Sequence, residues 1–290
     1  MEITEVVTAN EKIIRSSIFF GVLAVMAVWE LIAPCRSLSV SKTVRWLNNI
    51  SLVFINTFLV RLLFPTAAIG VAAFASNNGW GILNYYELPI LLSIIISVVA
   101  MDFVIYLQHV LVHSIPALWR FHRLHHADLD YDVTTGSRFH PVEIILSMLI
   151  KFATIIVLGP PVIAVIIFEI ILNATSMFNH SNVQLPFGMD KFVRLFLVTP
   201  DMHRVHHSIE DDEANSNFGF SLPWWDRLFG TYREQPRQGH TGMTIGIRQF
   251  REVKQVAWLP GMMMLPFKGK VSDYAINRRQ WADEKENKHE

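Results

Sequence analysis

The chain contains very little cysteine and little charge. Cys35 is its only cysteine in 290 residues, which excludes a disulfide framework and a metal site built from several thiolates. Lys and Arg number 25, as do Asp and Glu, so no excess of positive charge is present to attract nucleic acid. Charged residues make up 17% of the chain, below the roughly 25% of ordinary soluble domains, whereas 51% are hydrophobic. This balance predicts a membrane protein. Because cysteine is so scarce, any metal ion that the chain binds would be held by nitrogen and oxygen ligands.

Long apolar stretches support that prediction, since about 20 apolar residues cross a hydrocarbon core of about 30 Å. They run from Ile18 to Ala33, from Ile50 to Ala75, from Leu88 to His113 and from Val142 to Phe178. Gly159-Pro160-Pro161 interrupts the last stretch, and two consecutive prolines do not fit inside one regular helix. We therefore expect a helical hairpin there. The fold class is all-α, a polytopic bundle of about four to five membrane helices that carries a cytosolic, helical, His-rich cap.

Histidine is concentrated in three clusters. They are His109-x-x-x-His113, His122-x-x-His125-His126 and His203-x-x-His206-His207. Spacings of three and four residues place these imidazoles on one face of a helix, and imidazole binds zinc, copper, iron and nickel. Eight imidazoles exceed the four ligands of a structural zinc ion and fit two ions. Such ions would keep most of their charge and would suit either oxygen chemistry or a nucleophilic metal-bound hydroxide.

Two polar stripes within the apolar stretches point toward the same site. Each has side chains at i, i+4, i+7 and i+11: Asp102, Tyr106, His109 and His113 in one, and Glu169, Asn173, Ser176 and His180 in the other. The hairpin brings both stripes to the membrane face that carries the clusters, so His180 is a further candidate ligand. We expect the remaining candidates to contact ligand imidazoles rather than the metal; they are Asp102, His140, Glu169, Asn173 and Asp201. Asp201 also has the position of an N-cap for the helix of the last cluster.

The distribution of basic residues predicts the orientation. Arg36, Lys42 and Arg45 follow the first apolar stretch, whereas residues 76–87 contain no Lys or Arg. Because cytoplasmic loops are enriched in Lys and Arg, the histidine clusters should face the cytoplasm. We divide the chain into N-terminal membrane helices (1–87), a catalytic region (88–233) and a cytosolic or interfacial tail (234–290). Residues 247–259 are expected to form an amphipathic helix, either on the membrane surface or packed on the cap.

The order HxxxH, HxxHH, HxxHH on membrane helices resembles the fatty acid hydroxylase/sterol desaturase superfamily of membrane di-iron oxygenases. The resemblance covers residues 102–233 and includes DFVIYLQHVLVH, WRFHRLHH, RFHPVE, FNHSN, MHRVHH and NFGFSLPWWDRLFGTY. It implies an O2-dependent hydroxylation or desaturation of a fatty acyl or sterol-like lipid. It implies two iron ions held by His109, His113, His122, His125, His126, His180, His203, His206 and His207. Some members have another histidine where this chain has Ser176.

Electrons would come from a separate ferredoxin- or cytochrome-type donor, because no cytochrome-type domain or cysteine cluster is apparent. Two other functions fit parts of the sequence. A membrane zinc hydrolase would need a glutamate base beside the metal, as in HExxH, and neither HxxHH contains one. A metal-binding or transport protein would need polar positions spread through several spans, whereas here they gather at one end.

Overall fold

The computed structural model describes residues 3–64, 66–86 and 88–269, and these residues form helices joined by loops, with only isolated β-bridges. The long helices are α2 (Glu11–Ile32), α3 (Lys42–Leu63), α6 (Ile90–Ser114), α8 (Pro141–Leu158) and α9 (Val162–Asn179). The shorter elements are α1 (Ile3–Ala9), α4 (Ala68–Asn77), α5 (Ile82–Tyr85), α7 (Pro116–His126), η1 (Thr135–Ser137), α10 (Phe187–Val193), α11 (Pro200–His206), α12 (Asp211–Ala214), α13 (Trp224–Leu228), α14 (Gly239–Gly242), α15 (Val253–Val256), α16 (Leu259–Met264) and η2 (Leu265–Phe267).

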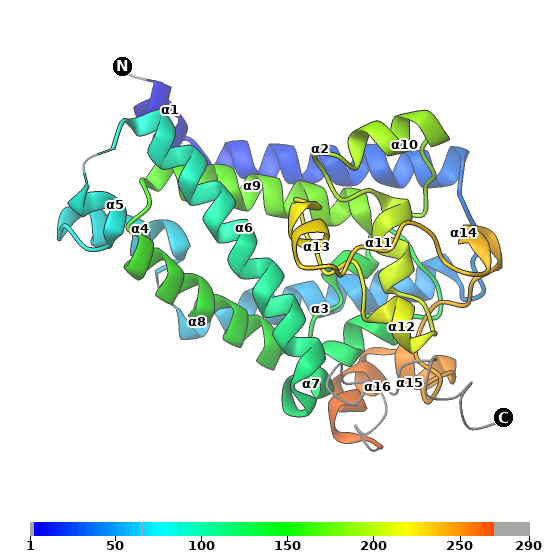
Figure 1. Cartoon of the computed structure of the whole chain (residues 1–290). Helices are drawn as coiled ribbons and strands as arrows, with labels where there is room; N and C mark the ends of the chain where they lie inside the picture. The colour runs from blue at the N-terminus through cyan, green and yellow to red at the C-terminus, as the bar shows by residue number, and fades with distance from the viewer. Residues whose placement is uncertain (1–2, 65, 87, 270–290) are drawn as a thin grey trace, which may run out of the picture.

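Five stretches of the described chain are long and apolar enough to cross a membrane; they are Glu11–Ile32, Lys42–Tyr85, Ile90–Ser114, Pro141–Leu158 and Val162–Asn179. Helices suit this role because every backbone hydrogen bond is made within the segment. Their outer surfaces are apolar and exposed, as at Phe20, Phe54 and Leu91. The chain is therefore a polytopic helical bundle. Figure 1 shows α2 and α9 side by side, with α6 running diagonally across α9.

The expected hairpin is present, but its arms diverge. Helix α8 ends at Leu158 and is followed by Gly159, which has φ of 66°, and α9 begins at Val162 after the two prolines. A Cβ on Gly159 would lie 2.5 Å from the carbonyl oxygen of Trp80, so glycine also permits a close backbone approach there. Helices α4 and α6 both contact α8 and α9. Ala68 and Ala72 of α4 are fully buried in this core, which shows why α4 carries small side chains.

The second apolar stretch differs from the expectation. We predicted one span from Ile50 to Ala75, but α3 begins at Lys42 and ends at Leu63, and α4 is a separate helix. Residues 42–49 belong to α3 because their polar side chains have partners in the cap. Arg45 is fully buried and pairs with Asp128 and Asp132.

A helical cap covers one end of the bundle and contains α7, α11, α12, α14, α15 and α16, opposite the end that carries α4 and α5 (Figure 1). Its core joins Trp119 and Leu124 of α7 to Ile247, Phe250 and Val256. The prediction of one amphipathic helix over residues 247–259 is wrong. An antiparallel bridge between Ile247 and Phe250 comes first, and α15 and α16 follow as short helices. The segment packs on the cap because its apolar side chains are buried there.

Candidate metal centre

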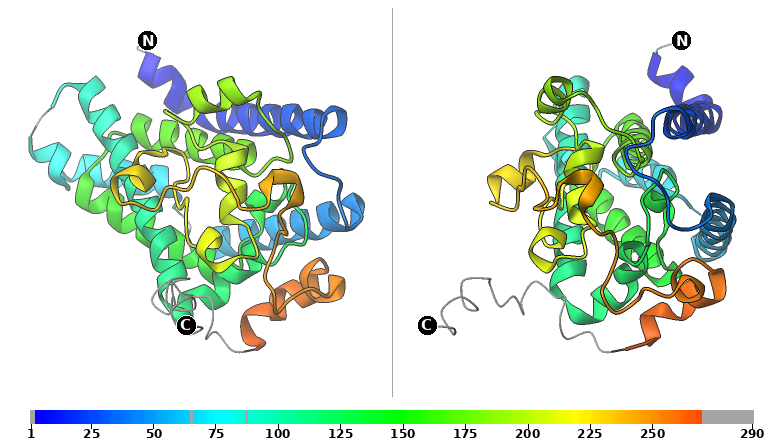
Figure 2. Two further views of the ribbon diagram at one scale, coloured as in Figure 1. Left: turned by 45° about the vertical axis from the view of Figure 1, so that its right-hand side comes forward. Right: turned by 90° about the vertical axis from the view of Figure 1, so that its right-hand side faces the viewer.

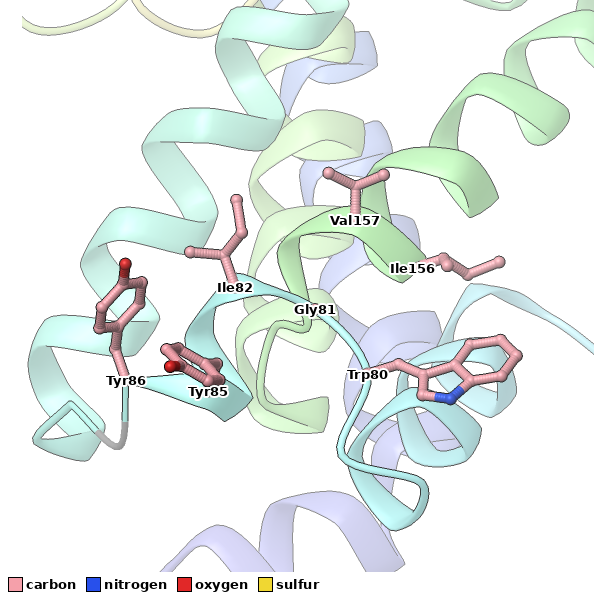
Figure 3. A pocket seen from close by; sticks show the side chains of 7 residues that line it. All are labelled: Trp80, Gly81, Ile82, Tyr85, Tyr86, Ile156 and Val157. Atoms are coloured by element: carbon pink, nitrogen blue, oxygen red, sulfur yellow. The ribbon is translucent and has the colours of Figure 1, made fainter.

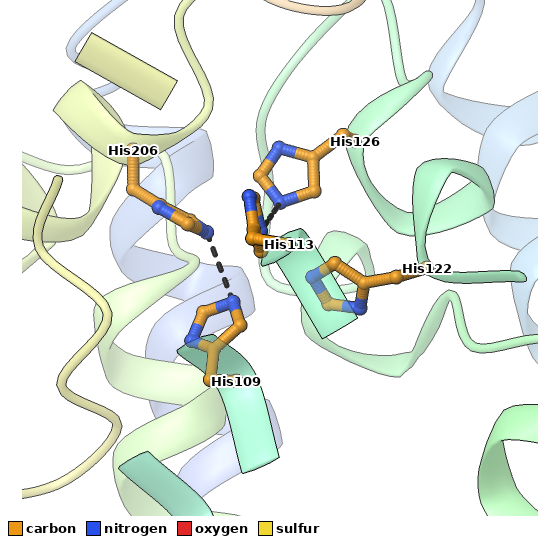
Figure 4. A group of neighbouring side chains, drawn as sticks. All are labelled: His109, His113, His122, His126 and His206. Carbon is orange, nitrogen blue, oxygen red and sulfur yellow. Dashed lines mark hydrogen bonds between the residues drawn. The ribbon is translucent and has the colours of Figure 1, made fainter. Parts of the chain in front are cut away.

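Nine buried histidines converge where α6, α7, α9 and α11 meet. Their donor atoms form two groups, within each of which all atoms lie within 4.8 Å of one another. The first group has five members, which are His109, His113, His122, His126 and His206; the second has four, which are His125, His180, His203 and His207. Figure 4 shows the first group, with imidazoles from α6, α7 and α11 directed at a common centre. Each HxxHH cluster contributes to both groups, so neither cluster makes a site by itself.

Local sequence explains how the helices deliver these side chains. Ile115 has an extended backbone and separates α6 from α7. Pro116 occupies the first turn of α7, where its missing N–H costs nothing. Thr199 caps α11 by accepting a hydrogen bond from the backbone N–H of Met202 at 3.3 Å. Asp201, which we expected to be this N-cap, instead lies in the first turn of α11. Its carboxylate accepts hydrogen bonds from Arg204 and Gln184, so that prediction is wrong.

Backbone carbonyls fix the tautomers of three of these rings. His109 donates through Nδ1 to the carbonyl oxygen of Phe218 at 2.8 Å, and His206 donates through Nδ1 to that of Ser216 at 2.7 Å. His180 donates in the same way to Ser176 at 2.8 Å. A neutral imidazole carries one proton. When Nδ1 carries that proton, Nε2 presents a lone pair, which is the form that binds a metal ion.

Several imidazoles of the two groups are also in the uncharged state that metal binding requires. Burial lowers the pKa of His206 to about 3 and that of His180 to about 4. Burial, together with neighbouring imidazoles, also lowers the pKa of His125, His126 and His203 well below the ordinary value. These rings are therefore neutral near pH 7.

The distances between the Nε2 atoms of neighbouring rings test whether a cation fits between them. Nε2 of His109 lies 3.0 Å from Nε2 of His206, although both rings hold their protons on Nδ1. Nε2 of His180 lies 3.0 Å from that of His203 and 3.2 Å from that of His125. The facing lone pairs of His109 and His206 repel unless a cation lies between them. In the second group only His180 has its proton fixed on Nδ1, so there the evidence for an ion is the close approach of the nitrogens. Two nitrogens bound at about 2.1 Å and at a right angle would be about 3.0 Å apart, so both groups fit a metal ion.

A carboxylate that we did not predict contacts the centre. Glu143, in the first turn of α8, accepts a hydrogen bond from Nδ1 of His122 at 2.6 Å. Nε2 of His122 has no hydrogen-bond partner among the described residues and remains available to an ion. An acidic residue near the start of a mostly apolar helix was the available signal, because buried carboxylates usually have a partner.

The structure gives the other predicted partner residues different contacts. Asp102 accepts hydrogen bonds from the indole N–H of Trp225 at 2.8 Å and from the backbone N–H of Leu222 at 3.3 Å. It therefore holds the loop that contains Phe218 rather than an imidazole. His140 lies outside both groups and caps α8 by accepting from the N–H of Val142.

Glu169 also acts away from the histidines. It pairs with Arg15 of α2 at 2.7 Å and with Lys151 of α8 at 3.0 Å. Asn173 donates to the carbonyl oxygen of Glu169 within its own helix. Arg61, a basic residue of the second apolar stretch, is exposed in the last turn of α3. The second polar stripe therefore reaches the metal centre only through His180, while its deeper part links three helices.

An open cavity of ≈ 590 Å³ lies at the other end of the bundle. Figure 3 shows its wall, formed by aromatic and aliphatic side chains of residues 80–86, which include α5, and of the end of α8. Its lining residues are Trp80, Gly81, Ile82, Tyr85, Tyr86, Ile156 and Val157. The cavity borders the Gly159 turn rather than the histidines, so it is not part of the candidate metal centre.

Comparison with known proteins gives one consistent result. Residues 94–231 match the model of the fatty acid hydroxylase family. The chain is 26% identical to an ornithine lipid hydroxylase of Rhizobium tropici over 240 residues, 79% of this chain and 70% of that protein. It is 29% identical to the alkylglycerol monooxygenase of Homo sapiens over 154 residues, 53% of this chain and 33% of the relative. It is 24% identical to the cholesterol 25-hydroxylase of Rattus norvegicus over 152 residues, 52% of this chain and 50% of the relative. No solved structure matches.

Proposed function

Since the chain belongs to the fatty acid hydroxylase/sterol desaturase superfamily, we propose that it is a membrane di-iron oxygenase that hydroxylates or desaturates a C–H bond of a lipid. The observation that carries this proposal is the pair of imidazole groups, with five and four members. In the first group, the Nδ1-protonated rings of His109 and His206 direct their Nε2 lone pairs at each other. The named relatives act on an ornithine lipid, an alkylglycerol and cholesterol. Those names support a lipid as the substrate class.

Two iron ions would supply dioxygen activation and the abstraction of hydrogen from the lipid. They would be held by His109, His113, His122, His126 and His206 in one group and by His125, His180, His203 and His207 in the other. Imidazole ligands are uncharged, so both ions would retain most of their positive charge. They would therefore favour an anionic oxygen ligand.

The protein's own residues orient and enclose this centre. Carbonyl groups of Ser176, Ser216 and Phe218 hold the Nδ1 protons of three ligands, which keeps each Nε2 directed inward. All nine rings are buried, so bulk water is excluded. The cap closes the site from one side, and the lipid would arrive from the membrane side.

The alternatives have less support. Glu143 is the carboxylate that a zinc hydrolase would need as a base, but it bonds to Nδ1 of His122, on the side of the ring away from Nε2. A transport path would need free polar groups along the spans, and Glu169 is instead paired with two basic residues.

We also propose residues 88–233 as the catalytic region, with 1–87 as membrane helices and 234–290 as the tail, of which 270–290 lie outside the described residues. The loop with Arg36 lies at the histidine end, because Arg36 donates to the carbonyl oxygens of His240 and Met243. This placement favours a cytoplasmic metal centre. A separate electron-donor protein completes the proposal.

The proposal is tested by metal analysis and by isotope labelling. Protein purified without oxygen should contain about two iron ions per chain, and one zinc ion or no metal would refute the di-iron assignment. His206→Ala should abolish iron retention, whereas His289→Ala, outside the described residues, should not. With membrane lipids, a reductant and labelled dioxygen, label in a lipid product indicates hydroxylation, and a new double bond without label indicates desaturation. Neither product from iron-loaded protein would refute the proposed activity.

A further inference from the structure

Helix α13 lies against the middle of a membrane-spanning helix, although it belongs to the segment that follows α11. The ring of Phe103 in α6 lies 4.7 Å from that of Trp225 and 5.9 Å from that of Phe229. The ring of Phe229 also stacks on Tyr106 at 5.6 Å. Phe103 precedes the end of α6 at Ser114 by 11 residues, which corresponds to about 16 Å along the helix. This packing places α13 beside the span rather than beyond its end.

Helix α10 is held to α13. The indole N–H of Trp224 donates to the carbonyl oxygen of Leu195 at 2.7 Å, just after α10, and the backbone N–H of Val198 donates to that of Ser221 at 2.9 Å. Figure 2 shows both helices, yellow-green and yellow, on the side of the bundle opposite the blue helices α2 and α3. The two helices therefore present one surface.

That surface is strongly apolar. Eight large apolar side chains on it are between 42% and 70% exposed; we call them the apolar face, and they are Phe187, Met189, Phe192, Leu195, Phe196, Trp224, Leu228 and Phe229. Such a concentration of exposed aromatic residues marks an interaction site rather than an ordinary surface. The exposed side chains of Leu107 and Leu111 lie further along α6, the helix on which α13 packs. The apolar face is thus continuous with the lipid-facing surface of a span.

The charges at the edge of the apolar face are basic. Lys191 and Arg227 are both exposed, and their cationic groups lie over the rings of Phe187 and Tyr232 at 4.4 Å and 4.3 Å. Asp190, the acidic residue of α10, is buried and paired with Arg194. Aromatic rings beneath basic groups suit an interface where the rings meet acyl chains and the cations meet phosphates.

We propose that the apolar face is inserted among the acyl chains of the bilayer leaflet at the histidine end. The segment from Asn182 to Arg233 then contains two interfacial helices in addition to the ligand-bearing α11. This insertion does not depend on the proposed enzymatic activity. It does place the lipid phase a few residues from Phe218, whose carbonyl group orients His109.

The insertion is tested with the full-length protein reconstituted in phosphatidylcholine vesicles. In a Cys35→Ser background, Leu228→Cys and Phe192→Cys each place one thiol on the apolar face, and Lys254→Cys places one on an exposed position of α15. Each thiol is labelled with bimane and exposed to two quenchers, phosphatidylcholine with a doxyl group on carbon 5 and aqueous iodide. Metal content and circular dichroism equal to those of the parent confirm that each variant is folded.

We expect doxyl lipid to quench bimane at 228 and 192 at least threefold more than at 254, and iodide to show the opposite order. Iodide quenching at 228 as strong as at 254 would overturn the proposal, because the face would then be in water. Protection of 228 from both quenchers would also overturn it, since a protein partner or a second copy would then cover the face. Two labelled positions on different helices separate a local effect of one substitution from the behaviour of the surface.

Discussion

The hydrogen bond between Glu143 and His122 allows a specific test of the metal centre. Both residues are buried and the bond is 2.6 Å long. A carboxylate on Nδ1 raises the basicity of the ligand nitrogen, and loss of such a partner typically weakens metal affinity about 10- to 100-fold. This range corresponds to roughly 1.4–2.7 kcal/mol. Glu143→Ala should show the full loss, and Glu143→Gln, which keeps an acceptor oxygen without the charge, should lie near the lower end.

The assay is iron retention against a competing chelator without oxygen, followed by Mössbauer spectroscopy of the retained iron. Because His122 belongs to the five-imidazole group and not to the other, only one of the two iron signals should change. Glu210→Ala is a suitable control, since Glu210 pairs with Arg248 on the surface.

Stability must be measured separately, because Glu143 also lies in the first turn of α8. Loss of its charge there removes a favourable interaction with the helix dipole of about 0.3–1 kcal/mol. The reasoning is refuted if Glu143→Ala retains iron like the parent, or if both iron signals weaken equally in a folded variant.

Three further predictions concern the scaffold. Arg45→Ala leaves the buried carboxylate of Asp132 without its cation and Asp128 with only Arg138. It should lower the free energy of unfolding by about 3–5 kcal/mol in denaturant titration, whereas the exposed Arg61→Ala should change it by less than about 0.5 kcal/mol; equal effects would contradict the assignment. Burial alone would raise the pKa of Asp128, but Arg138 and Arg45 lower it to about 2. Its contribution of about 2 kcal/mol should therefore be present above pH ~4 and lost as the pH falls toward 2, and Asp128→Asn should remove that part of the pH dependence. Thr199→Ala should cost about 1 kcal/mol through the lost cap, and an unchanged thermal midpoint would argue against it.

Local patterns were sufficient for much of the site. Spacings of three and four residues identify histidines on one helix face wherever that helix lies, and Gly159-Pro160-Pro161 predicts a reversal because its backbone cannot continue a helix. These two facts together place the clusters at one end of the bundle. The alignment of His180 with them follows from the same reversal.

The contacts of the carboxylates could not be predicted in this way. Asp102 and Glu169 lie on stripes that lead to histidines, yet their partners are Trp225 and Arg15, more than 100 residues away in the chain. Only the packing of α13 on α6 and of α2 on α9 creates those contacts. The divergence of α8 and α9 likewise depends on α4, which fits between them through small side chains.

The use of backbone carbonyls to hold His109 and His206 has a consequence for how the protein can vary. Replacing the side chain of Ser216 or Phe218 leaves the carbonyl oxygen in place, so neither substitution directly removes the group that sets a tautomer. A substitution of Asp226 would disturb these carbonyl groups instead. Its carboxylate accepts hydrogen bonds from the backbone N–H groups of Phe218 and Gly219 and so holds the backbone in place. Side chains in this loop can therefore be exchanged without removing the carbonyl groups that orient His109 and His206.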